Sequence, residues 1–356
     1  MTVETIDQAK AQEFAGSLVG ALNNGFNTLM ISVGQRTGLF DTLATLPPST
    51  SEQIARATGL NERYVREWLG GMTVSRIVEH DAQNGTYYFP REHAASLTRA
   101  AGPGNLASFA EFLAQMGKVE DDIVEAFHKG AGVPYAKYDK FQQLMRQESA
   151  QVFDATLIDV TLPLVDGLVD SLKAGIDVAD VGCGAGHAIN IMAREFPSSR
   201  FTGYDFSEEG VGIGRAEAQE WGLTNATFEV KDVSTLDGSK KFDLITVFDA
   251  LHDQAQPRKV LNRIAGSLKP GGVFLCADIA GDSNHAGNMD HPLGATMYAI
   301  STFHCMTVSL ALDGEGLGTM WGQQKARELL REAGFTSVEE KFVEGDIMNV
   351  YYICRK

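Results

Sequence analysis

The sequence of 356 residues predicts an α/β fold, in which a mainly parallel sheet flanked by helices follows an N-terminal region of helices. From residue 176 onward, short apolar segments alternate with helical patterns, which is typical of a parallel sheet. Before that point, apolar residues recur every three or four positions, as in amphipathic helices. A chain of this length exceeds one average core, so we expect more than one domain.

The composition predicts a folded, acidic protein. Hydrophobic residues make up 44% of the chain and charged residues 21%, and the formal net charge is -16. Such a surface repels a phosphate backbone, so we expect no nucleic-acid partner. The N-terminus lacks a signal pattern, and no apolar run reaches the roughly 18–20 residues of a membrane helix. We therefore expect a cytoplasmic location and no membrane partner.

The cysteines predict neither a disulfide framework nor a metal site. None of them forms a CxxC pair, and they are scattered through the chain at Cys183, Cys276, Cys305 and Cys354. This distribution indicates free thiols in a reducing compartment.

The N-terminal region combines a long apolar stripe with a winged-helix pattern. Helical periodicity extends over residues 5–46, and Pro47 and Pro48 end it. Between residues 51 and 89, two short helices and a hairpin follow. We expect Ser51 and Asn61 to cap the helices, and residues 77–78 and 86–89 to form the hairpin. The stripe consists of Phe14, Leu18, Leu22, Phe26, Leu29 and Val33.

A winged helix can serve DNA binding or packing. From residue 51 to residue 80, four glutamates balance four arginines, which leaves no basic face for a DNA groove. We therefore predict a packing and dimerisation module, with the apolar stripe supporting a homodimer. A cofactor-sensing regulator that binds DNA is the alternative.

A glycine loop follows the first predicted strand, residues 176–181. Residues 182–186 read GCGAG and lead into a helical pattern, an arrangement in which the backbone bends sharply against a ligand. The GxGxxG pattern of dinucleotide sites is absent, because His187 stands at its third glycine position. Asp180 suits a cationic amino-acid tail better than a pyrophosphate. The loop therefore favours S-adenosylmethionine over NAD, and a nicotinamide oxidoreductase is a weaker alternative.

Acidic residues also follow the next predicted strands. The strand 200–205 ends at Asp205, 23 positions after Gly182, a spacing that suits an acid binding ribose hydroxyls. Phe206 is then placed to pack on adenine. Asp232 follows the strand 227–230 and can accept a hydrogen bond from the adenine amino group. Two further strands are expected at 242–248 and 273–278.

The ordered segments DVGCGAG, YDFS, KDV, FDLITVFDALHD and LKPGGVFLCAD resemble class I S-adenosylmethionine-dependent methyltransferases. The resemblance covers residues 176–278, and a strand pair at 335–353 fits the family's reversed C-terminal strand. With the winged helix in front, the chain is similar to small-molecule O-methyltransferases. The implied domains are a helical and winged-helix dimerisation domain (1–100), a helical connector that contributes to the active site (101–172), and a Rossmann-like seven-stranded methyltransferase domain (173–356) with an insertion at 279–322.

The resemblance implies S-adenosyl-L-methionine as cofactor and assigns residues to its parts. Asp180 and the glycine loop would hold the methionine part, Asp205 the ribose, and Asp232 and Val233 the adenine. The implied cofactor-binding residues are Asp180, Gly182, Cys183, Gly184, Gly186, Asp205, Phe206, Asp232, Val233, Phe248, Asp249 and Tyr135.

His252 is the predicted catalytic residue. Methyl transfer from a sulfonium is an in-line displacement, and a hydroxyl acceptor benefits from a base that removes its proton. His252 follows the fourth strand in the sequence Leu251-His252-Asp253-Gln254, where related plant enzymes carry tryptophan at the last position. The alternatives are a histidine that only packs near the cofactor and an N-methyltransferase that needs no base.

The segment 279–322 is long for a loop, and long loops are often functional. We expect it to line a pocket for a small, partly apolar acceptor, together with residues of the N-terminal part. Plain core packing is the alternative. The predicted pocket residues are Phe26, Phe112, Met116, Met297, Tyr298, His304, Met306 and Trp321.

Overall fold

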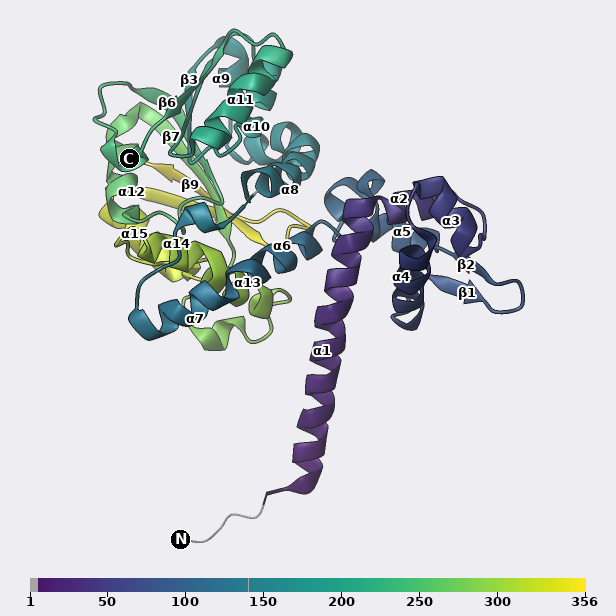
Figure 1. The fold of residues 1–356 in the computed structure, drawn as a ribbon. Helices are drawn as coiled ribbons and strands as arrows, with labels where there is room; N and C mark the ends of the chain where they lie inside the picture. The colour runs from purple at the N-terminus through teal and green to yellow at the C-terminus, as the bar shows by residue number, and fades with distance from the viewer. Residues whose placement is uncertain (1–5, 140) are drawn as a thin grey trace, which may run out of the picture. The chain divides into compact units, whose positions relative to one another are not determined.

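The computed structural model describes residues 6–139 and 141–356. The chain divides into two compact units, and the division falls between Ala114 and Gln115. Figure 1 labels most of the helices and strands in both units.

The first helix, α1 (Gln8–Thr37), is 30 residues long. It begins after Asp7, whose carboxylate accepts hydrogen bonds from the backbone N–H groups of Ala9 and Lys10. It ends at Gly38, which has a left-handed φ of 72° that favours glycine. The helical stretch predicted for residues 5–46 is therefore two helices, with α2 (Leu39–Leu43) after this turn.

The predicted apolar stripe lies on α1 and remains exposed. Phe14, Leu18, Leu22 and Phe26 are 65%, 50%, 62% and 70% exposed. An apolar face of this extent is unusual for a free helix surface. Only the C-terminal end of α1 packs, where the Trp68 indole N–H donates to the Met30 carbonyl at 2.8 Å.

The winged helix is confirmed, with two differences in detail. The N-cap of the first short helix is Thr50, not Ser51, because Thr50 has the extended backbone and forms a capping box with Gln53. The first wing strand begins at Glu79, after the predicted 77–78, since Val78 is buried in the core of this unit. The elements are α3 (Ser51–Thr58), α4 (Glu62–Val74), β1 (Glu79–Asp81) and β2 (Thr86–Tyr88).

Further helices precede the large sheet. Residues 130–138 separate two of them, because α7 stops at Gly130 in a left-handed conformation and the next long helix starts at Phe141. These helices are α5 (Arg91–Leu97), α6 (Phe109–Met116), α7 (Glu120–Lys129), α8 (Phe141–Thr156) and α9 (Leu168–Ala174).

The C-terminal unit contains a seven-stranded sheet with the order β5-β4-β3-β6-β7-β9-β8. The first five strands in this order are parallel, and β9 is antiparallel to both of its neighbours. The seven-stranded sheet and its reversed C-terminal strand are therefore confirmed. The strands are β3 (Asp177–Val181), β4 (Arg200–Asp205), β5 (Ala226–Val230), β6 (Phe242–Phe248), β7 (Leu268–Ile279), β8 (Ser337–Lys341) and β9 (Asn349–Arg355).

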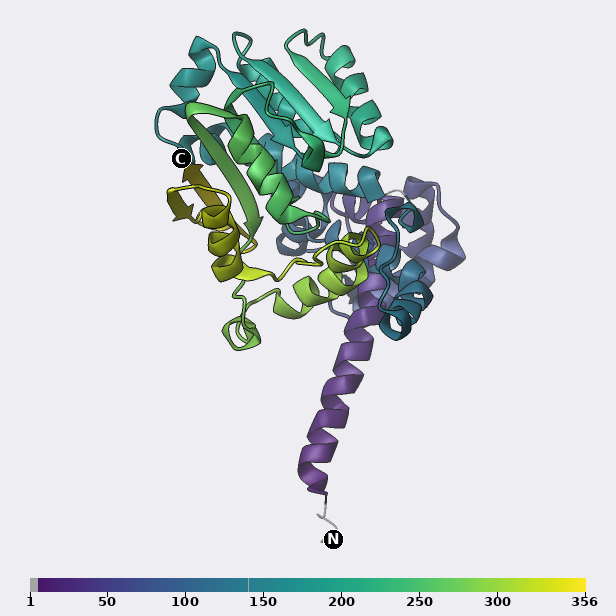
Figure 2. The same ribbon diagram turned by 90° about the vertical axis from the view of Figure 1, so that its left-hand side faces the viewer.

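Helices cover both faces of this sheet (Figure 2). Alternate residues of a strand face opposite sides, so Val178 packs in one core cluster and Ala179 in the other. The first cluster holds α9, α10 (His187–Glu195) and α11 (Glu208–Glu220). The second holds α12 (Pro257–Ser267) and α15 (Gly322–Glu332). The parallel register places the carboxyl ends of β3, β4, β6 and β7 along one edge.

The segment 279–322 has secondary structure of its own. It contains α13 (Gly294–Ile300), a π-helical turn (Ser301–Cys305) and α14 (Met306–Leu310). In the part of the chain that the structure describes, no helix combines the length and apolar character needed to cross a lipid bilayer.

Candidate cofactor and acceptor site

The glycine loop adopts a conformation that only glycine allows easily. Gly182, Gly184 and Gly186 have φ values of 73°, 52° and 71°. A Cβ on Gly186 would lie 2.3 Å from the Phe228 ring, and one on Gly182 would lie 2.7 Å from Ala250. The loop is therefore held close to the sheet, where its backbone is accessible to a ligand.

Asp205 joins this loop to the end of β4. It is 7% exposed, and its two oxygens accept hydrogen bonds from the backbone N–H groups of Gly184 and Ser207, each at 2.8 Å. Burial raises the pKa of Asp205, although these N–H groups oppose that shift. A carboxylate has about four lone-pair sites, so Asp205 can still accept from ribose hydroxyls.

Asp180 is the second buried acid at this edge. It is 3% exposed and accepts a hydrogen bond from the Thr246 hydroxyl at 2.7 Å. Burial, with a further contribution from Asp205, raises the pKa of Asp180 to about 7. A cation bound beside it would favour the ionised carboxylate.

Asp249 follows β6, is half-buried and has a strained backbone. Its φ of 50° lies in the left-handed region, which is uncommon for a residue other than glycine. Its Oδ1 atom is buried and has no hydrogen-bond partner among the described residues. Burial raises the pKa of Asp249 to about 7, and Asp278 adds to the shift. This oxygen therefore suits a ligand that donates a hydrogen bond or carries positive charge.

The residues predicted to frame the adenine lie at the other end of the edge. Asp232 is exposed and accepts from the Ser234 backbone N–H at 2.9 Å, whereas Val233 is buried. Phe206 is 52% exposed, and its ring lies edge-on to Tyr135 at 5.4 Å. An exposed aromatic face beside the Asp205 carboxylate suits a purine base.

His252 forms a buried pair with Asp278. Its Nδ1 atom lies 2.8 Å from Asp278 Oδ1, an oxygen that also accepts from the Trp321 indole N–H at 3.1 Å. Burial alone would lower the pKa of His252, but the Asp278 carboxylate outweighs it and raises this pKa well above its usual value. With Asp278 fixing the Nδ1 proton, Nε2 is the basic nitrogen.

Asp278 is a functional candidate that sequence reasoning missed. It ends the fifth predicted strand, so the rule that selected Asp205 could have found it. Asp253 was also missed. Burial raises its pKa to about 6, while His252 opposes that shift.

An aromatic cluster surrounds His304. The His304 ring is stacked on Phe141 at 3.9 Å, and Tyr138 and Tyr135 lie edge-on at 4.8 Å and 5.7 Å. Burial and the nearby His252 lower the pKa of His304 to about 3, so its imidazole is neutral. Its Nε2 atom is buried without a hydrogen-bond partner among the described residues. The predicted site residues Tyr135, Phe206 and His304 are therefore brought together.

The other predicted pocket residues of the C-terminal unit differ in exposure. Met297, Trp321 and Met116 are buried, and Met306 is half-buried. The Tyr298 hydroxyl accepts from the Asn288 amide at 3.0 Å.

Phe26 and Phe112 belong to the N-terminal unit, where Phe26 is exposed on α1 and Phe112 is buried on α6. Their place in the acceptor pocket stays a prediction. At the end of β6, the Phe248 ring packs against the Phe153 ring of α8 at 5.2 Å between ring centroids.

Two family models match separate parts of the chain. Residues 25–99 match the Rv2258c-like winged HTH domain, and residues 172–334 match a methyltransferase domain. These matches fall on the winged-helix and methyltransferase parts that the resemblance in the sequence predicted.

Curated relatives match over less than half of the chain. The ubiquinone biosynthesis O-methyltransferase of Coxiella burnetii is 30% identical over 106 residues, which cover 30% of this chain and 44% of that protein. The fatty-acid O-methyltransferase of Mycolicibacterium smegmatis is 31% identical over 167 residues, which cover 45% of this chain and 55% of that protein. The chain thus spans about half the length of these relatives.

Solved structures match over nearly the whole chain. A putative O-methyltransferase from Nostoc punctiforme has a TM-score of 0.72 at 17% identity and covers 99% of this chain and 100% of its own. Human N-acetylserotonin methyltransferase in complex with SAM has a TM-score of 0.66 at 19% identity, covering 100% of this chain and 99% of its own. These neighbours share the fold, and PigF and CalO1, two further ones, were solved with SAH.

Proposed function

We propose that the chain is an S-adenosylmethionine-dependent methyltransferase acting on an oxygen of a small, partly apolar acceptor. The observation that carries the proposal is the set of buried acids around the glycine loop, since Asp180 and Asp249 both have a pKa raised to about 7. Such carboxylates are costly to ionise unless a cation or a hydrogen-bond donor meets them. A sulfonium nucleoside with an ammonium tail supplies both.

The residues at the sheet edge fit this cofactor part by part. Asp180 and the loop would bind its methionine part, and Asp205 its ribose hydroxyls. Asp232 and Val233 would frame the adenine, with Phe206 against its face and Tyr135 beside it. Phe248 and Asp249 would close the site. When bound, S-adenosylmethionine supplies a methyl group that is already activated by the sulfonium.

His252 is the proposed general base. The Asp278 carboxylate holds the Nδ1 proton, so Nε2 receives the proton of the acceptor hydroxyl. Asp278 raises the pKa of His252 and so favours the protonated imidazole, whose Nε2 cannot accept a proton. A cation bound nearby would lower that pKa and favour the neutral imidazole that a general base requires. If the acceptor were an amine, no such base would be needed, and N-methylation is the second candidate.

The proposed acceptor pocket is built around the His304 cluster. Its aromatic rings supply apolar surface, and the Nε2 atom of His304 lacks a partner among the described residues, so it suits a polar group of the acceptor. The methionine and aromatic side chains of the segment 279–322 would extend this surface. The acceptor is thus proposed to be a small molecule with an apolar body and at least one further hydrogen-bonding group.

We also propose that the protein is a cytoplasmic homodimer in which α1 packs against a second copy. The exposed stripe of α1 supports this, because its large apolar side chains gain about 1.5–3 kcal/mol each when fully buried. The winged helix is proposed to serve packing and not DNA, since Arg63 and Arg66 of α4 form ion pairs with Glu67 and Glu62 of the same helix. A monomer in light scattering, or a mobility shift of DNA at moderate salt, would refute these points.

Calorimetry with S-adenosylmethionine, its demethylated product and NAD tests the cofactor assignment. We expect both sulfur nucleosides to bind and NAD not to bind. Asp180→Asn should weaken the binding of the sulfur nucleosides at least tenfold, which corresponds to a loss of about 1.4 kcal/mol in binding free energy. Asp170→Asn, at an exposed position of α9, is the matched control. Absence of binding to wild-type protein would end the enzymatic proposal. If the nucleosides bind, mass spectrometry of small molecules retained through purification would identify acceptors to assay.

A further inference from the structure

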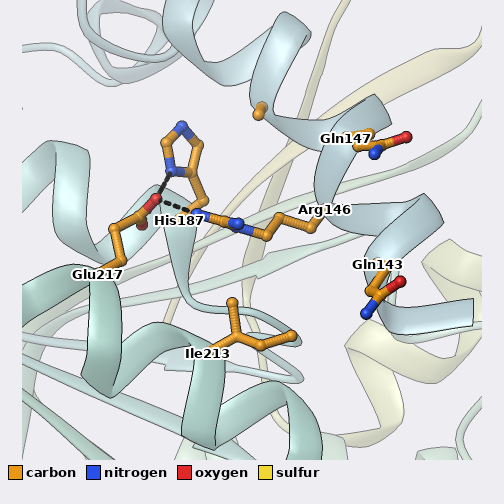
Figure 3. A pocket seen from close by; sticks show the side chains of 7 residues that line it. Gln143, Arg146, Gln147, His187, Ile213 and Glu217 are labelled. Carbon is orange, nitrogen blue, oxygen red and sulfur yellow. Dashed lines mark hydrogen bonds and ion pairs between the residues drawn. The ribbon is translucent and has the colours of Figure 1, made fainter. Parts of the chain in front are cut away.

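An ionic cluster connects three helices next to the glycine loop, with His187 and Glu217 buried (Figure 3) and Asp154 exposed. His187 is the first residue of α10, and its Nδ1 atom lies 2.9 Å from Glu217 of α11. Its Nε2 atom lies 3.2 Å from Asp154 of α8. Glu217 is 5% exposed and also accepts from Arg146 and Asn190, both at 2.9 Å.

This cluster is connected to the loop at two points. Gly186, the last loop residue, is the N-cap of α10, so His187 continues the loop directly. At the start of α8, Gln142 packs against the loop, since a Cβ on Gly184 would lie 3.5 Å from its side-chain oxygen. The Gln142 amide also donates to the Tyr135 hydroxyl. The cluster therefore fixes both the helix that continues the loop and the helix that packs on it.

The charges in the cluster depend on one another. A cation at the N-terminus of a helix opposes the helix dipole, and burial also disfavours charge on His187. The carboxylates of Glu217 and Asp154 nevertheless raise the pKa of His187 above its usual value. Burial would raise the pKa of Glu217, but hydrogen bonds from His187, Asn190 and Arg146 lower it to about 2. Two carboxylates from different helices thus favour the cationic form of His187.

Among the described residues, the other side chains that contact His187 or its carboxylates are neutral or positively charged. On α8, Arg146 is bound to Glu217. Past the end of α11, the Trp221 ring lies edge-on to His187 at 5.7 Å, and the Arg194 guanidinium of α10 lies over that ring at 4.2 Å. A cavity of about 390 Å³, lined by His187, Glu217, Arg146 and neighbouring residues of α8, opens onto the cluster. Solvent therefore reaches His187 without unfolding.

We propose that Glu217 and His187 are positioning residues for cofactor binding, which set the glycine loop through α10 and hold α8 against it. This inference rests on the proposed function. Neither residue touches the reacting atoms, so the cluster acts on affinity for the cofactor and not on the methyl-transfer step. Its cation is lost as the pH rises through the pKa of His187, and the grip on α8 weakens with it.

The test measures S-adenosylhomocysteine affinity by calorimetry from pH 6 to pH 9. For wild-type protein we expect affinity to fall at the alkaline end, where His187 deprotonates. His187→Gln should lose this alkaline decline, and Glu217→Gln and the milder Asp154→Asn should bind about three- to twentyfold more weakly at pH 7, as expected for a lost charge-assisted hydrogen bond. Glu220→Gln, at an exposed position of α11, is the matched control.

Two readouts separate this inference from the cofactor assignment. Both are measured without any ligand. Nuclear magnetic resonance of His187 should give a pKa above 6.5 in wild type and a lower pKa in Asp154→Asn. Amide hydrogen exchange in α8 should be faster in Glu217→Gln than in wild type. An ordinary His187 pKa, or variants that match the Glu220→Gln control in exchange and affinity, would overturn the inference. If wild type binds no nucleoside while these readouts hold, only the proposed function fails. With an identified acceptor, Glu217→Gln should raise KM for the cofactor and leave kcat nearly unchanged.

Discussion

Binding of S-adenosylmethionine should be coupled to the ionisation of Asp180. This carboxyl group is buried against Thr246 and Asp205, and its pKa is raised to about 7. In the proposed complex, its ionised form meets the ammonium group of the cofactor, which lowers that pKa. The free protein must therefore lose a proton from Asp180 before or during binding. The contribution of Asp180 to the affinity should then rise with pH and level off above its pKa, whereas any decline at higher pH belongs to His187.

The size of the effect follows from the pKa. At pH 6, a group with a pKa of 7 is about 90% protonated, so the apparent Kd is about elevenfold weaker than its limiting value. At pH 8 it is only about 1.1-fold weaker, so Asp180 contributes about a tenfold gain between these pH values. The pKa of Asp249 is also raised to about 7, so Asp249 adds a further gain in affinity if its carboxylate lies against the bound sulfonium.

Calorimetry of wild type and Asp180→Asn between pH 6 and pH 8 tests this coupling. Because asparagine does not titrate, the ratio of the two Kd values isolates Asp180 from every other titrating group. We expect this ratio to grow about tenfold over the range, and we expect proton release, measured in buffers of different ionisation enthalpy, to be smaller in the variant. A ratio that stays constant with pH would show that Asp180 is not ionised by the bound cofactor.

Three further outcomes are expected. His252→Gln should lower kcat by about 10²–10⁴ with an identified hydroxyl acceptor and change cofactor affinity less than threefold, and undiminished turnover would remove it as base. In denaturation curves, Gly186→Ala should lower the unfolding free energy by about 2–4 kcal/mol, because Gly186 has a φ of 71° and a Cβ there would clash with Phe228. The control Gly222→Ala should lower it by only about 1–2 kcal/mol, because Gly222 has a similar φ of 66° but open space around it. Leu22→Ser combined with Phe26→Ser should shift the protein from dimer to monomer in light scattering, and an unchanged mass would argue against pairing through α1.

Much of the sheet could be predicted because its strands are apolar runs with clear ends. The strands 200–205 and 242–248 agree with β4 and β6 residue for residue. The fifth strand was predicted too short, since the LKPGG segment reads as a turn. In the structure β7 extends back to Leu268, and the irregularity appears as a shift of register between Phe242 and Leu244. A glycine with φ of 77° at position 271 allows this without ending the strand.

Site residues could be predicted where they lie at the ends of strands, but not where they are brought together by the packing of helices. Asp180, Asp205 and Asp249 could be placed because parallel strands bring their carboxyl ends to one edge. The pairing of His252 with Asp278 joins two strands, and Trp321 reaches the same carboxylate from a third segment. The partners of His187 come from α8 and α11, and no local pattern marks them. Such contacts depend on how helices pack, which a single sequence does not encode in its spacing.

The position of β9 has a consequence for how the chain acquires its structure. This strand is inserted between β7 and β8, although it is the last of the three to be synthesised. Until Arg355 has left the ribosome, β7 exposes an open edge, and β8 has no neighbour at all. The C-terminal unit therefore cannot complete its sheet until β9 has emerged, and a nascent chain stalled before this point presents an unpaired edge to other chains. A chaperone that shields strand edges would be needed most in that interval.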